Sequence, residues 1–380
     1  MTIQRVPSLH DALAEVSDFR QASGRRYDLL AVLLLSCVAM MSGARSQSAI
    51  ADWGKNYGQR WLKLLGINRP RGPSQPTVHR IFKGVDACQV ERAITLWADA
   101  MLRSFSVSEA ALEALAIDGK SLRGSHKQGA KEDHLVSALS HRLGVVVAQI
   151  AVADKSKENG CLEPLLEAIV LEGRVITTDA LHTTRAVAQK IIEGGGDYLQ
   201  PVKANQPTLL EDIREVFNHA EELKDTITKA QTTDQHADRI ETRSLRTSTA
   251  LQDYLDWPGH AQVLELRRVI VNKHTRKTRH ELVYGITSLP PAEASAKELL
   301  KLWREHWHIE NKLHYVRDVT FDEDRSQVRS ESVPQVMAAL RNLAISVMRL
   351  CGADNIAAAC RRYAANPTLA FAAIGLIKRE

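Results

Sequence analysis

The chain lacks the features that mark a secreted or membrane-bound protein. Its 380 residues include five cysteines, and no two of them form a CxxC pair. An odd, scattered set of cysteines argues against a disulfide scaffold or a zinc site and favours reduced thiols in a cytoplasmic protein. No signal peptide is recognisable, and the one long apolar run, Leu29–Met41, is interrupted by Ser36. This run is too short to span a bilayer and suits a buried helix.

Neither sign of charge dominates. Lys and Arg number 50 against 45 Asp and Glu, which gives a formal net charge of +5 and a pI near 8.9. This mild basic excess permits a phosphate-bearing partner without requiring one. The chain is 44% hydrophobic and shows no internal repeat or low-complexity tract. It can therefore bury a substantial core, and its length predicts two or three domains.

Residues 1–105 are predicted to form a helical N-terminal domain. Helices are expected over residues 7–19, 29–41, 46–57 and 93–105, with a short helix that begins at Thr77. The short helix follows the breaker-rich sequence RPRGPSQP, and the helices around that turn resemble a helix-turn-helix with Arg80 and Lys83 as candidate DNA contacts. The alternative is a small helical domain with no more than a basic surface.

The pattern changes at Ala111. Strands are expected at residues 115–120, 134–140, 144–152, 174–179 and 198–203, with helices at 162–171 and 183–192. Strands connected by helices predict an α/β sheet with parallel strands, in which ligands bind at the carboxyl ends of the strands. Asp118 and Asp179 each stand at such an end.

A β-rich region is predicted after Pro207. A helix to about residue 223 and a polar stretch at 226–238 precede strands at 240–245, 261–272 and 281–288, and helices at 333–350 and 355–377 end the chain. The densest basic cluster, residues 272–280, contains Lys273, Arg276, Lys277 and Arg279. It is either a DNA contact or a solvated hairpin tip.

Residues 299–329 combine aromatic, cationic and acidic side chains. In the first twenty residues a helical period places one set on a common face: Trp303, His306, Trp307, Glu310, His314 and Arg317. Two explanations fit a carboxylate on this stripe. Either Glu310 pairs with Arg317 or a neighbouring His beside the core, or Glu310 is a metal ligand and the other ligands come from elsewhere in the chain. A zinc site is rejected because helical spacing separates residues 306 and 308.

Asp118, Asp179 and Glu310 would together suit phosphoryl transfer on a nucleic acid. Mg²⁺ binds carboxylate oxygens through few protein ligands, and a pair of such ions activates the attacking oxygen and stabilises the leaving oxygen. Spacing alone does not establish this trio, because any α/β protein offers Asp residues at strand ends.

Five stretches of the chain occur in the same order in one known family. They read AIDGKSLRGS, VADKSKE, TTDALHTTRAVAQKI, GGDYLQPVKANQPTL and HWHIENKLHYVRDVTFDEDRSQVR. Over about residues 9–350 the chain resembles bacterial insertion-sequence transposases of the ISAs type, the H-repeat-associated relatives within the DDE group. The resemblance implies an α/β fold: an RNase H-like catalytic core at 111–350 with a β-rich insertion at about 207–290, plus helical N-terminal and C-terminal regions, the latter at 351–380.

The resemblance also assigns site residues. Asp118, Asp179 and Glu310 match the three catalytic acids, which bind Mg²⁺ or Mn²⁺. Arg317 fits the basic residue expected seven positions after the Glu. The Arg expected four positions before the Glu is His306 here, with Arg304 two positions further back as a candidate DNA contact.

Two further positions belong to the VKANQ motif. Lys203 and Asn205 would hold a DNA phosphate near the metals, or they would only end a strand and cap the next helix. The later acids of DVTFDED are assigned structural roles, paired with arginines such as Arg325 and Arg329: Asp318, Asp322, Glu323 and Asp324.

These observations predict a transposase that binds double-stranded DNA at the inverted-repeat ends of its element and at the target. It would cut and join DNA as a homodimer in the bacterial cytoplasm, associated with the nucleoid and not with a membrane. The alternatives are a catalytically inactive, retained DNA-binding protein, a metal-dependent nuclease that does not join DNA, and an α/β interaction module that binds no metal.

Overall fold

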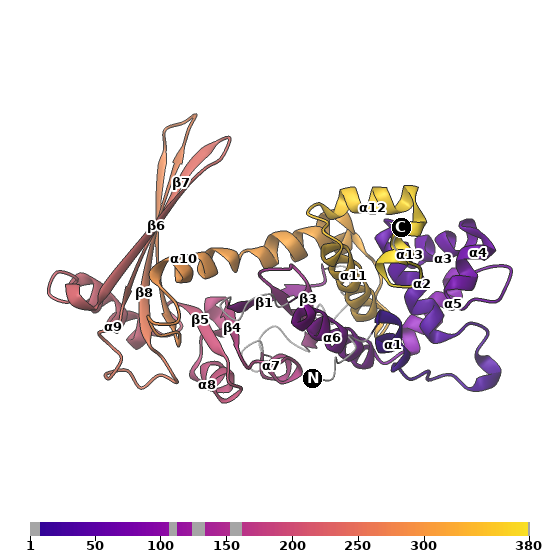
Figure 1. Cartoon of the computed structure of the whole chain (residues 1–380), viewed down its shortest axis with the longest axis horizontal. Coiled ribbons are helices and arrows are strands. Elements are labelled where there is room, and N and C mark those ends of the chain that lie inside the picture. Colours follow the sequence, from indigo (N-terminus) through magenta and orange to yellow (C-terminus); the bar gives the residue numbers. More distant parts are fainter. Residues whose placement is uncertain (1–7, 106–111, 124–133, 153–161, 379–380) are drawn as a thin grey trace. The chain divides into compact units, whose positions relative to one another are not determined.

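The computed structural model describes residues 8–105, 112–123, 134–152 and 162–378 (Figure 1). They form two compact units. Unit 1 contains the described residues within the ranges Met1–Ala111, Gly119–Ile169 and His308–Glu380, and unit 2 contains Leu112–Asp118 and Val170–Trp307. The chain thus folds as a mixed α/β protein with a large sheet and many helices.

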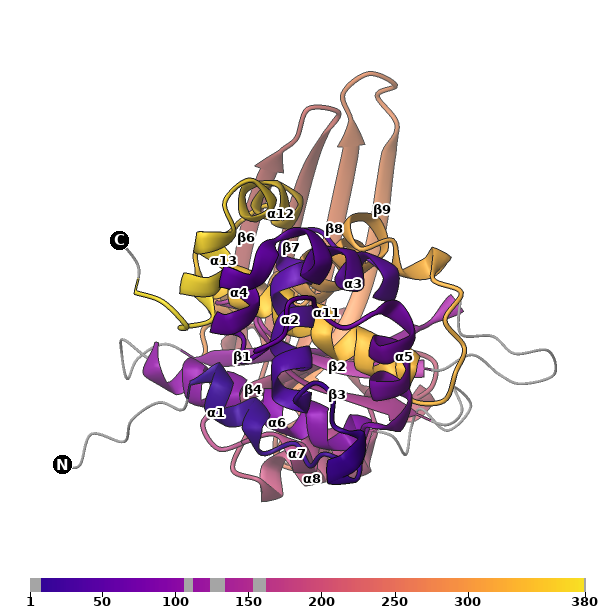
Figure 2. The same ribbon diagram turned by 90° about the vertical axis from the view of Figure 1, so that its right-hand side faces the viewer.

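Unit 1 is mainly helical. Its helices are α1 (Leu9–Ala14), α2 (Leu29–Met41), α3 (Gln47–Asn56), α4 (Gly58–Leu64), α5 (Gln75–Gly84), α6 (Ala87–Ser104), α7 (Leu162–Ala168), α11 (Val333–Leu350), α12 (Ile356–Ala365) and α13 (Pro367–Ala373). The apolar helix α2 is buried nearly all round, and it packs against α1, α3, α11, α12 and α13 (Figure 2). Helices from both ends of the chain therefore share one core.

Most helix boundaries in unit 1 follow from the sequence. The predicted helix at 29–41 is confirmed residue for residue, and Ser46 and Tyr57 cap α3 at the predicted limits. Helix α6 begins earlier than predicted, because the Asp86 carboxylate accepts hydrogen bonds from the backbone N–H groups of Cys88 and Gln89. The predicted helix at 355–377 is divided, because Pro367 begins a new helix.

A hairpin of β2 (His134–Ser140) and β3 (Val146–Val152) completes unit 1 and confirms the prediction for these residues. Gly144 has φ +64 in the connecting turn, a conformation that glycine adopts without strain. Strand β3 packs against α6, α7 and α11.

A buried polar network centred on Glu323 crosses the core of unit 1. The Glu323 carboxylate lies 2.6 Å from Arg317 Nε and 2.7 Å from Arg341 Nη1, and all three side chains are almost completely buried. Burial alone would raise the pKa of Glu323, but the two guanidinium groups hold it below its usual value. Gln149 on β3 accepts a hydrogen bond from Arg317 (3.4 Å) and another from Asn342 (2.7 Å).

The network ends at Glu91 on α6. Its carboxylate accepts one hydrogen bond from Gln149 Nε2 (2.7 Å) and one from Gln335 Nε2 (2.8 Å). Burial raises the pKa of Glu91 to about 7, although both hydrogen bonds oppose the shift. Strand β3, α6 and α11 are therefore joined by side chains that also fix Arg317.

Unit 2 is organised on a twisted sheet. Its strands are β1 (Glu113–Ser121, up to Asp118), β4 (Arg174–Thr178), β5 (Asp197–Val202), β6 (Ile227–Gln235), β7 (Arg239–Ser248), β8 (Gln262–Asn272) and β9 (Thr278–Thr287). Strand β4 pairs in parallel with β1 and with β5, and β9 then pairs with β5 in the antiparallel sense. The order within this unit is β1-β4-β5-β9-β8-β7-β6.

The β-rich region predicted between the second and third acids is confirmed, and it extends the same sheet. Its long hairpins are visible in Figure 1. The polar stretch at 226–238, for which no strand was predicted, contains β6, an edge strand whose side chains are polar on both faces. A strand of that composition gives no alternating apolar signal.

Three helices belong to unit 2: α8 (Arg185–Glu193), α9 (Pro207–Asn218) and α10 (Ala296–Glu305). Helix α10 packs its leucines on β6 and β7, and Leu299 and Leu302 share a cluster with Leu245. A Cβ at Gly285 on β9 would lie 2.4 Å from the Trp303 ring, so glycine is what lets this ring contact the strand.

The single continuous helix predicted through Glu310 is wrong. Helix α10 ends at Glu305, and the chain then forms two π-helical turns at Ile309–His314 and Val316–Thr320. Hydrogen bonds from residue i to i+5 widen these turns, so the α-helical stripe is lost. Trp307 is 61% exposed, whereas Arg317 is completely buried. Among the described residues, no helix is both long and apolar enough to span a lipid bilayer.

We expect Glu91 to make stability depend on pH. Its folded pKa of about 7 lies above its usual 4.5, so the folded chain retains a proton that the unfolded chain loses. Stability should therefore fall by roughly 3 kcal/mol as pH rises from 4.5 to 7. Glu91→Gln should remove this part of the pH dependence and raise the melting temperature at pH 8. If the melting temperatures of wild type and Glu91→Gln changed equally with pH over this range, the raised pKa would not belong to Glu91.

Candidate catalytic site

The register of β1 and β4 aligns the first two candidate acids. Ile117 is paired with Thr178 in parallel, and the next residue on each strand is an acid, Asp118 and Asp179. Adjacent strands lie about 4.8 Å apart, so Asp118 within β1 and Asp179 directly after β4 lie side by side. The strand end predicted before Asp179 is confirmed, whereas β1 continues past Asp118 to Ser121. The pairing shows that these two strands are neighbours.

Asp179 faces solvent and lies near one cation. Its side chain is 54% exposed, and its carboxylate accepts a hydrogen bond from the Ala180 backbone N–H. Lys203 Nζ lies 3.7 Å from the same oxygen, at the end of β5. Lys203 therefore lies beside this acid, and its predicted contact with a DNA phosphate stays a prediction.

Asn205 braces the loop that follows Asp179. Its Nδ2 donates to the backbone oxygen of Ala180 (2.8 Å), and the neighbouring Gln206 Nε2 donates to that of Thr183 (3.1 Å). Asn205 does not cap α9, because Gln206 is the residue before that helix. The VKANQ motif therefore supports the Asp179 loop through amide hydrogen bonds, a role that neither sequence interpretation included.

The two candidates that precede Glu310 in the chain contact other parts of unit 2. His306 Nδ1 lies 2.8 Å from the hydroxyl of Thr177, two residues before Asp179 on β4. His306, which stands where the family has an Arg, therefore supports β4, the strand that leads to Asp179. Arg304 pairs with Asp234 on β6 at 3.0 Å, so its guanidinium is engaged within the sheet region.

Glu310 belongs to unit 1 and stands in the first π-helical turn. His314 Nδ1 lies 3.5 Å from the Glu310 carboxylate, and the His314 side chain is buried while that of Glu310 is 54% exposed. Of the two pairings considered from the sequence, the His partner is therefore found and the Arg317 partner is not. The pairing places a buried imidazole beside a carboxylate that is about half exposed.

The DNA contact predicted for Arg317 is wrong in this structure. The guanidinium is completely buried and ion-paired with Glu323, so it cannot reach a phosphate. Sequence spacing placed Arg317 on the same α-helical face as Glu310, but the wider π-helical turns direct its side chain into the core.

The structural role predicted for the later acids is confirmed, with partners other than those expected. Lys120 Nζ lies 2.6 Å from Asp318 and 3.4 Å from Asp324, and its side chain is only 10% exposed. Burial raises the pKa of Asp318, although Lys120 opposes the shift. Asp322 pairs with Arg325 at 3.6 Å, which is one of the arginine partners expected from the sequence.

The other basic residues predicted to contact DNA differ in whether they already bind partners within the protein. Lys83 on α5 pairs with Glu331 at 3.0 Å, and Arg279 on β9 pairs with Glu281 at 2.7 Å. Lys273 Nζ donates to the His236 backbone oxygen at 2.5 Å. The exposed side chains of Arg276 and Lys277 occupy the tip of the β8–β9 hairpin, where no ion pair involves them among the described residues. Arg80 on α5 is also exposed.

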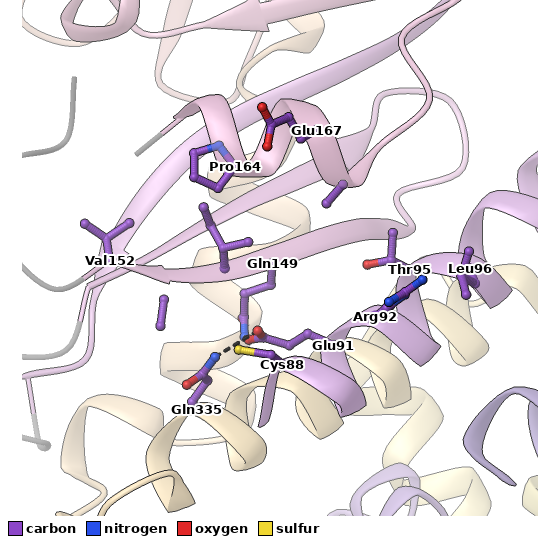
Figure 3. A pocket seen from close by; sticks show the side chains of 13 residues that line it. Cys88, Glu91, Arg92, Thr95, Leu96, Gln149, Val152, Pro164, Glu167 and Gln335 are labelled. Atoms are coloured by element: carbon purple, nitrogen blue, oxygen red, sulfur yellow. Dashed lines mark hydrogen bonds between the residues drawn. The ribbon is translucent and has the colours of Figure 1, made fainter. Parts of the chain in front are cut away.

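A separate pocket of about 780 Å³ lies in unit 1 between α6, β3, α7 and α11 (Figure 3). Glu91, Gln149 and Gln335 meet at one wall through the hydrogen bonds described above. None of the three candidate acids lines this pocket.

The donor groups suit a hard divalent cation. Asp118 and Asp179 offer carboxylate oxygens from neighbouring strands of unit 2, the ligands that such a cation prefers. Two adjacent carboxylates repel each other, and Lys203 offsets only part of that repulsion across 3.7 Å. Oxygen ligands without cysteine favour Mg²⁺ or Mn²⁺ over zinc.

Comparison with known proteins gives concordant matches. The family described as Transposase DDE domain matches residues 109–347, and the one described as DDE_Tnp_1-associated matches residues 10–98. The chain is 29% identical to "Putative transposase YncI" of Escherichia coli O157:H7, across 91% of this chain and 88% of that protein. It is 28% identical to "H repeat-associated putative transposase YhhI" of Escherichia coli strain K12, across 90% of each.

One solved structure also aligns with the chain. It is the piggyBac transposase synaptic complex with hairpin DNA, at 10% identity and a TM-score of 0.42, covering 97% of this chain and 77% of that one. This likeness is too low to support an inference.

We expect Mg²⁺ or Mn²⁺ to raise the melting temperature of the full chain by a few degrees, because a bound cation relieves the repulsion between the acids. At 100 times Kd the stabilisation would be about 2.7 kcal/mol. Asp179→Asn should abolish the metal-induced shift, even if it stabilises the metal-free chain. Asp253→Asn, at an exposed acid of unit 2, should keep the shift. An equal shift in both variants would rule out Asp179 as a ligand.

Proposed function

The chain belongs to the Transposase DDE domain family, and from that premise we propose that it is a DNA transposase. It binds the inverted-repeat ends of its own insertion sequence, hydrolyses a phosphodiester to free a 3′-hydroxyl, and joins that end to target DNA. The observation that carries the proposal is the pairing of Ile117 with Thr178, which puts Asp118 within β1 beside Asp179 directly after β4.

In this mechanism Asp118, Asp179 and Glu310 hold two divalent cations. When bound, such ions activate the attacking oxygen and neutralise charge on the leaving oxygen. His314 holds the Glu310 carboxylate from its buried side, at 3.5 Å. Lys203 lies 3.7 Å from Asp179 and binds a phosphate of the cleaved strand once the acids are occupied. Asn205 and His306 keep the Asp179 loop and β4 in place.

The core that presents these residues is RNase H-like in this proposal. Support comes from the parallel pairing of β1, β4 and β5 and from the antiparallel β2–β3 hairpin. The β-rich insertion, which continues the sheet through β9, carries a DNA-binding hairpin tip.

DNA contacts outside the acids come from two regions. Arg80 on α5 and the tip residues Arg276 and Lys277 are exposed and are the strongest candidates. Lys83, Lys273 and Arg279 would first have to release protein partners. The working unit is a homodimer on DNA, because both element ends must be cut together. It acts in the bacterial cytoplasm, at the nucleoid.

The central experiment measures cutting and joining directly. Purified full chain would be mixed with labelled DNA that carries the ends flanking its gene, with Mg²⁺ or Mn²⁺, and nicked and joined products would be scored. Asp118→Asn, Asp179→Asn and Glu310→Gln should each lower both products by more than about 100-fold, since even outer-shell partners of metal ligands cost 10–100-fold. Asp253→Asn is the matched control.

Each outcome selects one function. Metal-dependent joining that is lost in all three variants establishes the transposase. Cleavage without joining indicates a nuclease, and DNA binding without cleavage indicates a retained, inactive protein. Cleavage that survives Glu310→Gln would mean that the third ligand is another residue.

We expect the β8–β9 tip to bind DNA phosphates without reading sequence. Arg276 has φ +59, so Arg276→Asn is chosen because Asn tolerates that conformation. Combined with Lys277→Gln, it should weaken DNA binding and reduce the slope of log Kd against log salt by about 1 to 2. Arg279→Gln, at the residue paired with Glu281, should change the slope less. An unchanged slope in the double variant would exclude the tip from the interface.

A further inference from the structure

The π-helical segment of unit 1 presents a narrow exposed face. Between residues 309 and 320 the exposed side chains are Glu310, Asn311, Tyr315 and Val319, and they recur every four or five residues. Their neighbours Leu313, His314, Val316 and Arg317 are buried. This spacing follows from i to i+5 hydrogen bonding.

Tyr315 is one turn from the third candidate acid. Its backbone N–H donates to the Glu310 carbonyl oxygen, which fixes the two residues in successive π-helical turns on the same side. The Tyr315 side chain is 59% exposed and Val319 is 54% exposed. An aromatic ring and an aliphatic side chain thus stand in solvent beside a carboxylate that is itself half exposed.

The exposed Tyr315 ring beside the Glu310 carboxylate suits a ligand that has a flat apolar surface close to a phosphate. A nucleobase fits, because it offers a π-face and is covalently joined to the phosphate that the acids would engage. Stacking on an aromatic side chain is tolerant of sequence, and a Tyr hydroxyl can remain in water while its ring is covered.

We propose that the ring of Tyr315 stacks on a base next to the cleaved phosphate and positions the DNA end. The inference rests on the proposed transposase function and deepens it. Tyr315 is a positioning residue: it takes no part in bond making, and it holds the strand while the acids act. Val319 extends the apolar surface by one further turn.

The experiment compares Tyr315→Ala, Tyr315→Phe and Tyr315→Leu with wild type. Tyr254→Ala is the matched control, because Tyr254 is 71% exposed and lies in unit 2. The probe is a precut duplex that carries the element end with 2-aminopurine at the terminal positions. Its affinity, its fluorescence when bound and its joining rate are measured together.

We expect Tyr315→Ala and Tyr315→Leu to weaken binding of the precut end by about 10-fold, the loss of one stacked base. Both variants should also lose the fluorescence change at one position and slow joining. Tyr315→Phe should restore all three readouts, because it keeps the ring. Tyr254→Ala should match wild type.

Failure of this inference is distinguishable from failure of the transposase proposal. If wild type joins ends and Glu310→Gln does not, but Tyr315→Ala behaves as wild type, stacking is overturned and the transposase stands. A Phe variant as defective as Ala also overturns stacking. If Tyr315→Ala instead changes the oligomeric state without DNA, measured by sedimentation, the face is a protein interface. If wild type itself neither cuts nor joins, the proposed function fails first.

Discussion

The parallel pairing of β1 with β4 is the constraint on which the candidate site depends. It sets Ile117 beside Thr178, and the next residue on each strand is an acid. Strand geometry thus brings two negative charges together with no help from their side chains. The surroundings of Asp179 offset the resulting repulsion: a backbone N–H and the Lys203 ammonium lie near its carboxylate, and Asn205 holds the following loop. Glu310 is supported differently, by the buried His314 in unit 1.

The interior of unit 1 contains a second electrostatic arrangement, which is closed to solvent. Arg317 and Arg341 flank one carboxylate, that of Glu323, and the extra positive charge is accommodated by hydrogen bonds to Gln149 and to the Arg45 backbone oxygen. Removing one partner from such a group leaves a buried charge uncompensated. The network therefore anchors the π-helical segment at Arg317, a few residues from Glu310, and gives that segment a fixed orientation in its unit.

Much of the fold could be predicted from local sequence signals. Leu29–Met41 is a long apolar run with clear ends, and it forms the predicted helix. The helix predicted at Val333–Leu350 is also observed with the predicted bounds. Asp118 and Asp179 were found because short apolar runs ended in acids. Other features depend on information that is not local. Strand β6 is polar on both faces and is specified by pairing with β7. The position of Arg317 was predicted wrongly because a separation of seven residues from Glu310 keeps a common face only in an α-helix. Nothing in the neighbouring sequence indicates the wider turns of a π-helix. The pairing of His306 with Thr177 joins residues far apart in the chain.

The π-helical geometry makes the length of this segment more critical than its composition. Each residue of a helical turn advances the chain around the helix axis, so deleting one residue between Glu310 and Arg317 would rotate everything that follows. The Arg317 guanidinium would then point toward water, and an exposed side chain would face Glu323. Substitutions at Asn311 or Val319 leave this alignment intact. We therefore expect natural variation here to exchange residues at exposed positions other than Glu310 and Tyr315, while insertions and deletions are rejected.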